Sequence, residues 1–405
     1  MKRVGNLFEA VVEPENLRLA FWKASRGKRD RPDQRAFAMR LEDEIEGLRV
    51  GLLQGDYPVG EYTRFTVYDP KERVICAAAF RERVLHHALM NVCEPWIDKW
   101  LIADTFACRV GMGQARAVRR AQAFARRHAW FLKCDVRKFF DSVPHVGLKA
   151  LLRRKFKDGR LLSWCDRIID TYETAPGRGL PIGNLTSQHF ANLYLDPLDR
   201  FVKETLRFGG YVRYMDDFVV WGADGETLKR ARSAVTAFAA ERLGLELKAE
   251  AFINRTRHGM DFLGMRVFPH TVRIDRRSLR RFVAKTRRYE WLLAQGVWTE
   301  RRFQERMTAL TAFVAQGDTL HWRRDFFRER ATNVGLEPVP PGRELEQQRQ
   351  QRALRQPELE QPEQQQQQQR VPGRLPLSTT DKLEERVWSP SVSGFRQRNE
   401  ERLAA

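Results

Sequence analysis

Residues 211–221, YVRYMDDFVVW, place two adjacent aspartates between two runs of β-prone residues. Val, Tyr, Phe and Trp favour strands, so this segment predicts a β-hairpin with Asp216 and Asp217 at its turn. Two neighbouring carboxylates repel each other unless a cation neutralises them. The pattern leaves two interpretations, a solvated Asp-Asp turn and a paired-carboxylate metal site.

Positive charge is concentrated in two parts of the chain, which has 405 residues and a formal net charge of +20. Residues 116–160 hold 14 basic and 3 acidic residues, and residues 273–330 hold 15 basic and 7 acidic residues. Such stripes attract polyanions, and a nucleic-acid backbone is the commonest one. Surface charge kept only for solubility is the simpler alternative.

Neither the cysteines nor the apolar residues indicate export or membrane insertion. The five cysteines form no CxxC pair and show no metal-finger spacing, which favours reduced thiols. No apolar run reaches the length of a transmembrane helix, and the N-terminus lacks a signal-peptide core. We therefore expect a cytoplasmic protein.

Apolar periodicity predicts an α+β fold with enough hydrophobic residues for two or three subdomains. Helical spacing is expected in residues 5–55, 80–101, 146–172, from the Gly-rich loop 177–183 through Leu198, 225–243 and, as a basic module, 272–330. Strand-like spacing is expected in residues 61–78, 130–135, 245–248 and 260–267, with a turn at 141–144. Beyond about Gly335 the Pro-rich and Gln-rich composition predicts disorder.

A third aspartate, Asp135, ends the predicted strand 130–135, about eighty residues before the hairpin. Two strands brought side by side would place Asp135 next to Asp216 and Asp217. Hard oxygen ligands of this kind bind Mg²⁺. Two such ions would activate a primer 3′-hydroxyl and stabilise a leaving pyrophosphate. This order of strand, Gly loop, helix and hairpin favours the metal-site interpretation.

With these motifs in this order, residues 16–327 resemble the reverse transcriptases. The resemblance implies that Asp135, Val136, Asp216 and Asp217 form the metal set, in motifs A and C. It also implies that Phe140 is the bulky gate that would clash with a ribose 2′-hydroxyl. A core aromatic packed beside Phe139 is the alternative for that residue.

The resemblance gives roles to further residues. Lys71 and Arg73 resemble the fingers pair that grips the incoming triphosphate. Lys248 resembles the motif D lysine that protonates the leaving group, as one of the catalytic residues. The primer grip would comprise Phe262, Leu263 and Gly264. The implied cofactor is Mg²⁺, as two ions for which Mn²⁺ would substitute, and the implied partners are a template RNA, a DNA or RNA primer and deoxynucleotides.

A right-hand polymerase fold follows from the same resemblance. Its expected parts are an N-terminal helical extension (1–55), fingers (56–125), a palm of antiparallel sheet and helices (126–270), a helical thumb (271–334) and a disordered Gln-rich tail (335–405).

Residues 179–188, GLPIGNLTSQ, carry Ile-Gly and Ser-Gln where most retroelement enzymes carry Gln-Gly and Ser-Pro. This pattern is similar to motif B of the reverse transcriptases of diversity-generating retroelements, as are residues 15–20, 69–75 and 83–88. In that family the enzyme copies a template-repeat RNA with errors opposite adenine, and the DNA replaces a variable repeat of a target gene. Ile182 and Gln188 would then loosen the geometric check on the nascent base pair.

The resemblance implies a bacterial or phage-encoded protein that works with a separate accessory variability determinant, a basic helical oligomer. The alternatives are a defence-associated enzyme, a group II intron-like enzyme and an RNA-binding protein built on an inactive palm. The residues beyond the thumb leave no room for a maturase domain and an endonuclease, which disfavours the intron type. The presence of all three aspartates disfavours the inactive palm.

Overall fold

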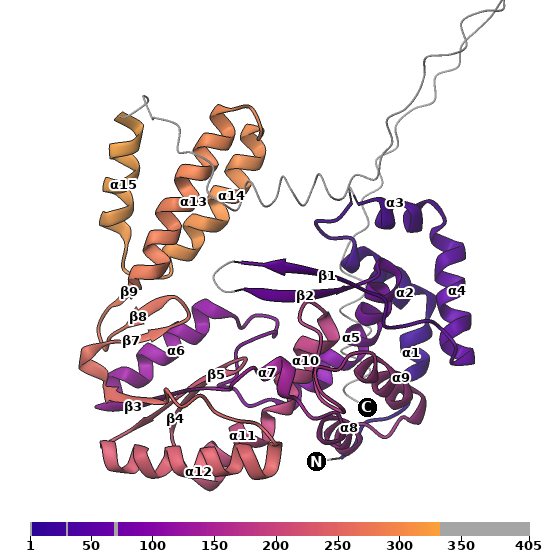
Figure 1. Cartoon of the computed structure of the whole chain (residues 1–405), viewed down its shortest axis with the longest axis horizontal. Coiled ribbons are helices and arrows are strands. Elements are labelled where there is room, and N and C mark those ends of the chain that lie inside the picture. Colours follow the sequence, from indigo (N-terminus) through magenta and orange to yellow (C-terminus); the bar gives the residue numbers. More distant parts are fainter. Residues whose placement is uncertain (1, 30, 69–71, 333–405) are drawn as a thin grey trace, which may run out of the picture. The chain divides into compact units, whose positions relative to one another are not determined.

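Helices and antiparallel strands alternate along the chain (Figure 1), which confirms the predicted combination of helix and antiparallel sheet. The structure, a computed structural model, describes residues 2–29, 31–68 and 72–332, with side chains as far as Arg328. The predicted tail at 335–405 therefore lies outside the described residues. Within the described ranges, no helix combines the length and apolar character that crossing a bilayer requires.

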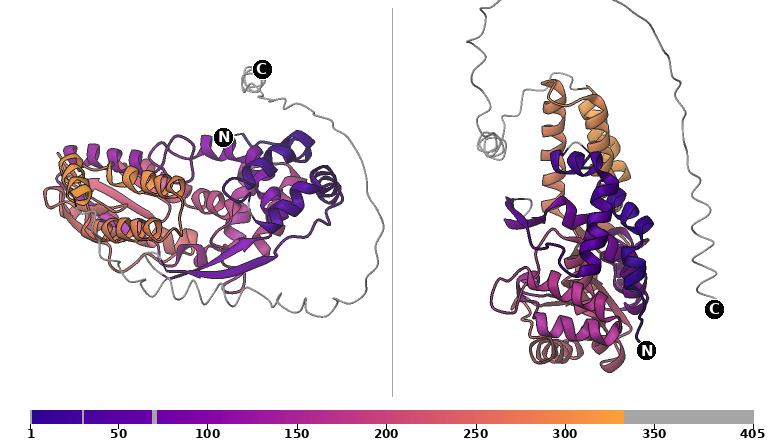
Figure 2. Two further views of the ribbon diagram at one scale, coloured as in Figure 1. Left: turned by 90° about the horizontal axis from the view of Figure 1, so that it is seen from above. Right: turned by 90° about the vertical axis from the view of Figure 1, so that its right-hand side faces the viewer.

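Four helices precede the first strand, as the periodicity of residues 5–55 predicts. They are α1 (Phe8–Val12), α2 (Pro14–Ala24), α3 (Pro32–Met39) and α4 (Leu41–Gln54). The buried residues of α2 recur every three or four positions, and α2 packs against α5 (Phe80–Trp100). The Asn16 amide donates hydrogen bonds to the carbonyls of Val11 and Ala88 at 3.0 and 3.1 Å. α1, α2 and α3 contact α5, and α4 contacts α1, α2 and α3, so these helices, indigo in Figure 2, form one group with α5.

The central sheet has the strand order β4-β5-β3-β6, and all neighbours are antiparallel. Its strands are β3 (Trp130–Asp135), β4 (Gly210–Tyr214), β5 (Asp217–Gly222) and β6 (Phe252–Arg255). Side chains alternate between the two faces of a strand. Val219 and Trp221 pack in one cluster with α6 (Gln114–Arg127), whereas Phe218 and Val220 pack with α12 (Gly225–Leu243). Figure 1 shows these two helices on opposite faces of the sheet.

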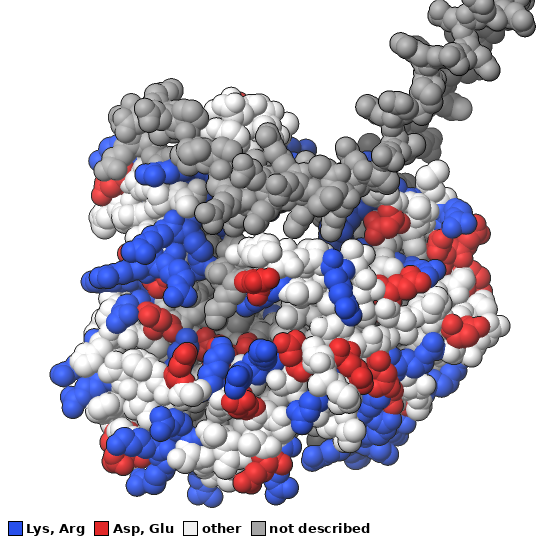
Figure 3. Space-filling view, viewed as in Figure 1, with Lys and Arg blue, Asp and Glu red and all other residues white. Residues whose placement is uncertain are grey.

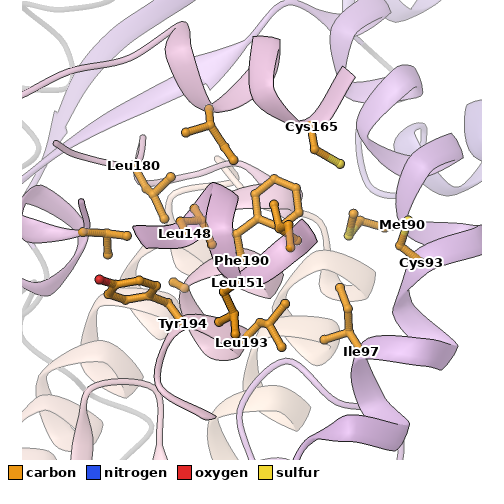
Figure 4. Packing of buried hydrophobic residues seen from close by; sticks show 14 of the residues in the cluster. Met90, Cys93, Ile97, Leu148, Leu151, Cys165, Leu180, Phe190, Leu193 and Tyr194 are labelled. Atoms are coloured by element: carbon orange, nitrogen blue, oxygen red, sulfur yellow. The ribbon is translucent and has the colours of Figure 1, made fainter. Parts of the chain in front are cut away.

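The helix α10 (Leu185–Tyr194) lies inside the larger hydrophobic cluster and is buried along most of its length. Figure 4 shows its side chains among those of α5, α8 (His145–Lys155) and α9 (Gly159–Asp170). The labelled residues are Met90, Cys93, Ile97, Leu148, Leu151, Cys165, Leu180, Phe190, Leu193 and Tyr194. Because α10 follows the Gly-rich loop directly, this packing fixes the end of that loop.

Two smaller sheets flank the central one along the chain. The first is the hairpin of β1 (Tyr62–Val67) and β2 (Arg73–Ala78), and the second joins β7 (Met260–Phe262), β8 (Met265–Val267) and β9 (Val272–Ile274). The remaining α-helices are α7 (Phe139–Ser142), α11 (Asp196–Arg200), α13 (Arg276–Ala294), α14 (Glu300–Val314) and α15 (Leu320–Thr332). A π-helical turn, Phe201–Thr205, extends α11, and a 3-10 turn, Thr256–His258, follows β6.

Three local predictions were wrong in detail. The single helix through Leu198 is divided into α10 and α11, because Pro197 has no N–H to continue the helical hydrogen bonds. Residues 260–267 form a hairpin, with Leu263 and Gly264 at positive φ (51° and 77°) in its turn. Residues 245–248 make only one isolated bridge, between Leu247 and Val136, whereas the strand beside β3 is β6.

Candidate active site

The register of the central sheet brings the predicted carboxylates together. Asp135 at the end of β3 is the direct partner of Asp217 at the start of β5. Asp216 occupies the turn before β5, and its carbonyl accepts a hydrogen bond from the Val136 N–H at 3.3 Å. The side chain of Val136 is buried and apolar, so only its main-chain carbonyl would serve as a ligand. Two strands eighty residues apart therefore meet at one carboxylate centre.

Two lysines contact this centre. Lys133 Nζ lies 3.2 Å from Asp217 Oδ2, and Lys248 Nζ lies 2.6 Å from Asp135 Oδ2. The other oxygen of each carboxylate, Asp135 Oδ1 and Asp217 Oδ1, is buried and has no hydrogen-bond partner. Among the described residues, no group of three or more His, Cys, Asp or Glu side chains stands in a metal-holding arrangement. The lysines thus pair with one oxygen of each carboxylate, and the other oxygen of each, a hard donor, has no partner.

The pKa values of the hairpin carboxyls are raised. Burial raises the pKa of Asp217 to about 7, with a further rise from Asp135 and Asp216 and an opposing effect of Lys133. Burial, followed by the neighbouring Asp135, also raises the pKa of Asp216. Both shifts have the same physical cause, negative charge held out of water with too little positive charge beside it. A divalent cation would remove that cost, so the residues present fit the magnesium that the resemblance implies.

A basic cavity of about 1330 Å³ opens beside the centre. Lys133 and Asp217 line it, and so do all three residues predicted as the primer grip, Phe262, Leu263 and Gly264. Its arginines are Arg73, Arg266, Arg273, Arg276, Arg277 and Arg281. Figure 3 shows Lys and Arg gathered over the region of β8, β9 and the start of α13. This lining suits a polyanion next to the carboxylates.

Arg73 is the one described member of the predicted triphosphate grip, since Lys71 lies outside the described residues. It is exposed at the start of β2 and lines the carboxylate cavity. Its positive charge lowers the pKa of Asp216 against the effect of burial. The structure thus places Arg73 on the same cavity as Asp217, and its contact with a triphosphate stays a prediction.

Phe140 and Ile182 lie outside the residues that line this cavity in the described part of the chain. Phe140 is half-buried in α7, with its ring 5.7 Å from that of Phe139 in an edge-to-face contact. Its carbonyl accepts the Leu180 N–H at 2.7 Å, which ties α7 to the Gly-rich loop. This geometry agrees with the core-aromatic alternative, and the gate role of Phe140 stays a prediction.

The Gly-rich loop is bonded to β2. The Cys76 N–H donates to the carbonyl of Ile182 at 2.8 Å, and the Ala78 N–H donates to Asn184 Oδ1 at 3.2 Å. Between them, Gly183 has φ +116°, and a Cβ there would lie 2.7 Å from Ile75 Cγ2. Only glycine fits this approach without strain. Hydrogen bonds therefore join the loop that carries Ile182 to β2, the strand that carries Arg73.

Gln188 faces a second, smaller cavity of about 320 Å³. Its lining includes Lys23, Arg26, Arg109 and Cys108, whose Sγ lies 3.5 Å from Gln188 Oε1. The structure therefore does not place Gln188 with the carboxylates, and its nucleotide contact stays a prediction.

Sequence reasoning missed Lys133 as a member of the centre. The signal was present, because residues two apart on a strand share a face, which puts Lys133 on the face of Asp135. Its Nζ also donates to the carbonyl of Asp261 in β7 at 2.8 Å. Lys133 thus joins the carboxylate centre to β7, the strand that ends in Phe262 of the predicted primer grip.

Residues 69–267, just under half of the chain, match the family model described as "Reverse transcriptase (RNA-dependent DNA polymerase)". The chain carries a reverse transcriptase domain. All three aspartates, both lysines and Arg73 lie inside it. The domain is an RNA-directed DNA polymerase.

Curated relatives match the reverse transcriptase domain at low identity. Protein YkfC of Escherichia coli (strain K12) is 24% identical, and the match covers 65% of this chain and 83% of YkfC. Group II intron-encoded protein LtrA of Lactococcus lactis subsp. cremoris is 26% identical, and the match covers 40% of this chain and 28% of LtrA. The chain thus spans most of the first relative and under a third of the second.

Among solved structures, apo telomerase from Candida Tropicalis, truncated from the C-terminal domain, superposes with a TM-score of 0.42 and 13% identity. The match covers 53% of this chain and 55% of the telomerase chain.

Proposed function

We propose that the whole chain copies a template-repeat RNA into DNA with errors opposite adenine, and so diversifies a target gene. The observation that carries this proposal is the loop text GLPIGNLTSQ at residues 179–188, in a chain whose carboxylates are otherwise complete. The loop that carries Ile182 is hydrogen-bonded to β2, the strand that carries Arg73, and Arg73 lines the carboxylate cavity. We therefore expect an active polymerase with a weakened check on the geometry of the nascent base pair.

Asp135, Asp216 and Asp217, with the carbonyl of Val136, would hold the magnesium ions. When bound, the ions would supply Lewis-acid activation of the attacking hydroxyl and of the phosphates. The support is the pair of buried, unpartnered oxygens, Asp135 Oδ1 and Asp217 Oδ1, together with the raised pKa of Asp217. Mn²⁺ prefers the same oxygen ligands and would substitute.

The chain's own residues would bind and orient the substrates. Arg73 would pair with the triphosphate of the incoming deoxynucleotide, because a guanidinium matches phosphate geometry. Lys248, whose Nζ donates to Asp135 Oδ2 at 2.6 Å, would protonate the leaving group. The arginines at the start of α13 would bind the primer-template backbone, with Phe262, Leu263 and Gly264 at the primer end.

The sheets and helices support the predicted parts of a right-hand polymerase. We assign residues 126–270 to the palm, because the central sheet and its carboxylates lie there. Residues 56–125 would be the fingers, with the β1–β2 hairpin as their mobile element. Residues 271–334 would be the thumb, since their described part is helical and basic. Residues 1–55 would be the N-terminal extension.

The apolar side chain of Ile182 would reduce the discrimination between correct and wrong base pairs. A polar side chain at this loop position would make hydrogen bonds that depend on the geometry of the nascent pair, whereas an aliphatic one makes none. Wrong pairs would then lose little binding energy relative to correct pairs. We further propose that a separate accessory variability determinant helps to hold the template RNA, and that the protein acts in the cytoplasm of a bacterium.

A group II intron-like or defence-associated reverse transcriptase is the second candidate. The observation in its favour is the 26% identity to the intron-encoded protein LtrA, over 40% of this chain. Such an enzyme would make DNA without an excess of errors at one template base.

Primer extension on a defined RNA template, with the products sequenced and errors sorted by template base, separates the two candidates. We expect DNA synthesis with errors concentrated at template adenine, in assays with the native RNA and accessory protein supplied. Errors spread evenly over the four bases would contradict diversification and favour the second candidate. The Asp216→Ala, Asp217→Ala double variant gives the background.

Ile182→Gln tests the assigned cause of the errors. We expect fewer errors at template adenine and little change at the other three bases. Val146→Gln is a matched control, because Val146 is 80% exposed on α8 and lines neither cavity. An unchanged adenine error rate in Ile182→Gln would remove Ile182 from the explanation.

A further inference from the structure

Arg213 on β4 is fully buried three residues before Asp216. Its guanidinium pairs with Asp199 of α11, and both side chains have 0% exposure. Nε and Nη2 donate to the two carboxylate oxygens of Asp199 at 2.6 and 2.7 Å. A buried ion pair of this kind rarely stabilises a fold more than apolar residues of the same volume would. Its presence under the carboxylate turn therefore calls for another role.

The remaining N–H groups of Arg213 bind main-chain and amide oxygens. Nη1 donates to Asn192 Oδ1 at 2.8 Å and to the carbonyl of Met215 at 3.0 Å. Nη2 donates to the carbonyl of Asn192 at 3.0 Å. A guanidinium has five N–H donors, so every donor of Arg213 has an acceptor. In this orientation every N–H of the side chain is hydrogen-bonded, and one of the acceptors is the Met215 carbonyl in the turn.

The carbonyl of Met215 belongs to the peptide bond that leads into Asp216. Met215 has φ +55°, in the left-handed region that residues other than glycine rarely adopt. Such a conformation is strained and persists only where its surroundings hold it. The hydrogen bond from Arg213 holds the plane of this peptide, and hence the direction in which the Asp216 side chain leaves the turn.

The anchor on the other side of Arg213 is equally complete. Asp199 accepts hydrogen bonds from the Tyr211 hydroxyl at 2.6 Å and from Thr105 Oγ1 at 2.9 Å. Asn192 Nδ2 donates to the carbonyl of Ala107 at 2.9 Å. Networks in which each member is satisfied define one geometry. These hydrogen bonds connect the turn, through Arg213, to α10, α11 and residues 104–107.

We propose that Arg213 is a positioning residue, which fixes the Met215–Asp216 peptide and so presents the Asp216 carboxylate to the divalent metal. Through Asn192 it also ties the turn to α10, the helix that begins directly after the Ile182 loop. The inference rests on the proposed metal role of Asp216. It adds a residue that touches neither metal nor nucleotide and still sets the metal affinity.

Arg213→Lys tests this role, because lysine keeps the positive charge beside Asp199 and lacks the planar, five-donor group that also reaches Met215. The first readout is Mn²⁺ binding to the full chain without nucleic acid, followed by electron paramagnetic resonance. Loss of a residue that orients a metal ligand typically weakens metal binding about 10–100-fold, and we expect a loss in this range. We expect kcat in primer extension to fall, with the KM for deoxynucleotide unchanged.

Arg200→Lys is the matched control. Arg200 also binds two carboxylates, Asp196 and Glu204, and the carbonyl of Trp100, but it does not contact the turn. We expect wild-type Mn²⁺ affinity in this variant. Equal loss of Mn²⁺ affinity in both lysine variants, in proportion to lower thermal stability, would overturn the positioning role.

Asn192→Leu covers the case in which Arg213→Lys does not fold. It keeps the Arg213–Asp199 pair and removes one acceptor of the guanidinium, and we expect weaker Mn²⁺ binding in the folded protein. Unchanged Mn²⁺ binding in this variant would overturn the proposal, as would wild-type Mn²⁺ binding in Asp216→Ala. Evenly spread errors in wild-type primer extension would contradict the diversification function alone, since they leave the Mn²⁺ comparison intact.

Discussion

Two antiparallel hairpins of similar length line the basic cavity, through Arg73 and Asp217, and they are built in opposite ways. The β4–β5 hairpin is buried on both faces, with Val212, Val219 and Val220 at 0% exposure. The β1–β2 hairpin exposes Val74 to 51% and Val67 to 37%. Elements with few buried contacts open at low free-energy cost, whereas core strands do not. We therefore expect the β4–β5 hairpin, which begins β5 with Asp217, to stay rigid, and the β1–β2 hairpin, which carries Arg73, to move at lower free-energy cost.

Contacts at the bases of the two hairpins connect them through the Ile182 loop and α10. The exposed hairpin is bonded at Cys76 and Ala78 to the Ile182 loop, and Tyr62 meets Thr171 at 2.6 Å. The loop leads into α10, whose Asn192 binds Arg213 beneath the buried hairpin. A motion of the β1–β2 hairpin would therefore be transmitted to the Ile182 loop, while the buried β4–β5 hairpin stays in place.

The greatest loss of activity is expected for Asp135, which lies on β3, the strand that pairs with β5 of the buried hairpin. Asp135→Asn keeps the side-chain shape and removes the charge, and we expect the rate of primer extension to fall by about 10³-fold or more, as for other groups that stabilise transition-state charge. RNA binding, measured by filter retention, should stay within a factor of about two, because phosphate contacts dominate affinity. Asp141→Asn, a neighbouring acid on α7, is the control. Residual activity above a tenth of wild type would contradict the carboxylate assignment.

Arg73→Ala tests the exposed hairpin. We expect the KM for deoxynucleotide to rise about 10-fold or more, which corresponds to the 1.5–3 kcal/mol of a hydrogen bond to a charged group. Steady-state primer extension over a range of deoxynucleotide concentrations measures it. Arg64→Ala is the matched control, because Arg64 is exposed on β1 and does not line the carboxylate cavity. An equal rise in both variants would show a general charge effect.

Gly183→Ala tests the bond between the exposed hairpin and the loop. Its Cβ would meet Ile75 Cγ2 at 2.7 Å with φ at +116°, so we expect about 1–3 kcal/mol of lost stability in urea unfolding. We also expect a raised KM for deoxynucleotide, since the clash displaces the hairpin that carries Arg73. Gly177→Ala is the control, with φ +67° and nothing within 4 Å of its Cβ. Equal losses in the two variants would mean that the contact with Ile75 contributes nothing.

The smallest expected effect concerns α10, which links the two hairpins. Burial lowers the pKa of His189 to about 4, with a small opposing effect of Asp98. The unfolded chain, with a histidine pKa near 6.5, binds the proton more readily, so stability is present above about pH 6.5 and is lost as pH falls toward 4. In His189→Gln the midpoint of urea unfolding should depend less on pH in this range. An identical slope in the variant would exclude His189 as its source.

Some elements could be predicted from sequence because their signals are local. β3 begins and ends at the predicted residues, Trp130 and Asp135, since apolar alternation ends at the acid. The helix predicted at 225–243 has those bounds because Asp224 caps its first turn and Gly244 ends it in the left-handed conformation. By contrast, β6 (Phe252–Arg255) has four residues and a weak pattern, and only its pairing with β3 makes it a strand.

The order of the candidate site residues can be predicted from the amino-acid sequence alone: an aspartate at the end of one strand, a Gly-rich loop, and two aspartates in a hairpin turn. Local propensities and motif spacing suffice for that order. The fold was needed to show that Asp135 is the strand partner of Asp217, that Lys133 and Lys248 pair with these two carboxylates, and that Arg213 donates to the carbonyl of Met215 in the turn. These contacts join residues far apart in the chain, and the packing of α10, α12 and the sheet, rather than any local pattern, sets their register.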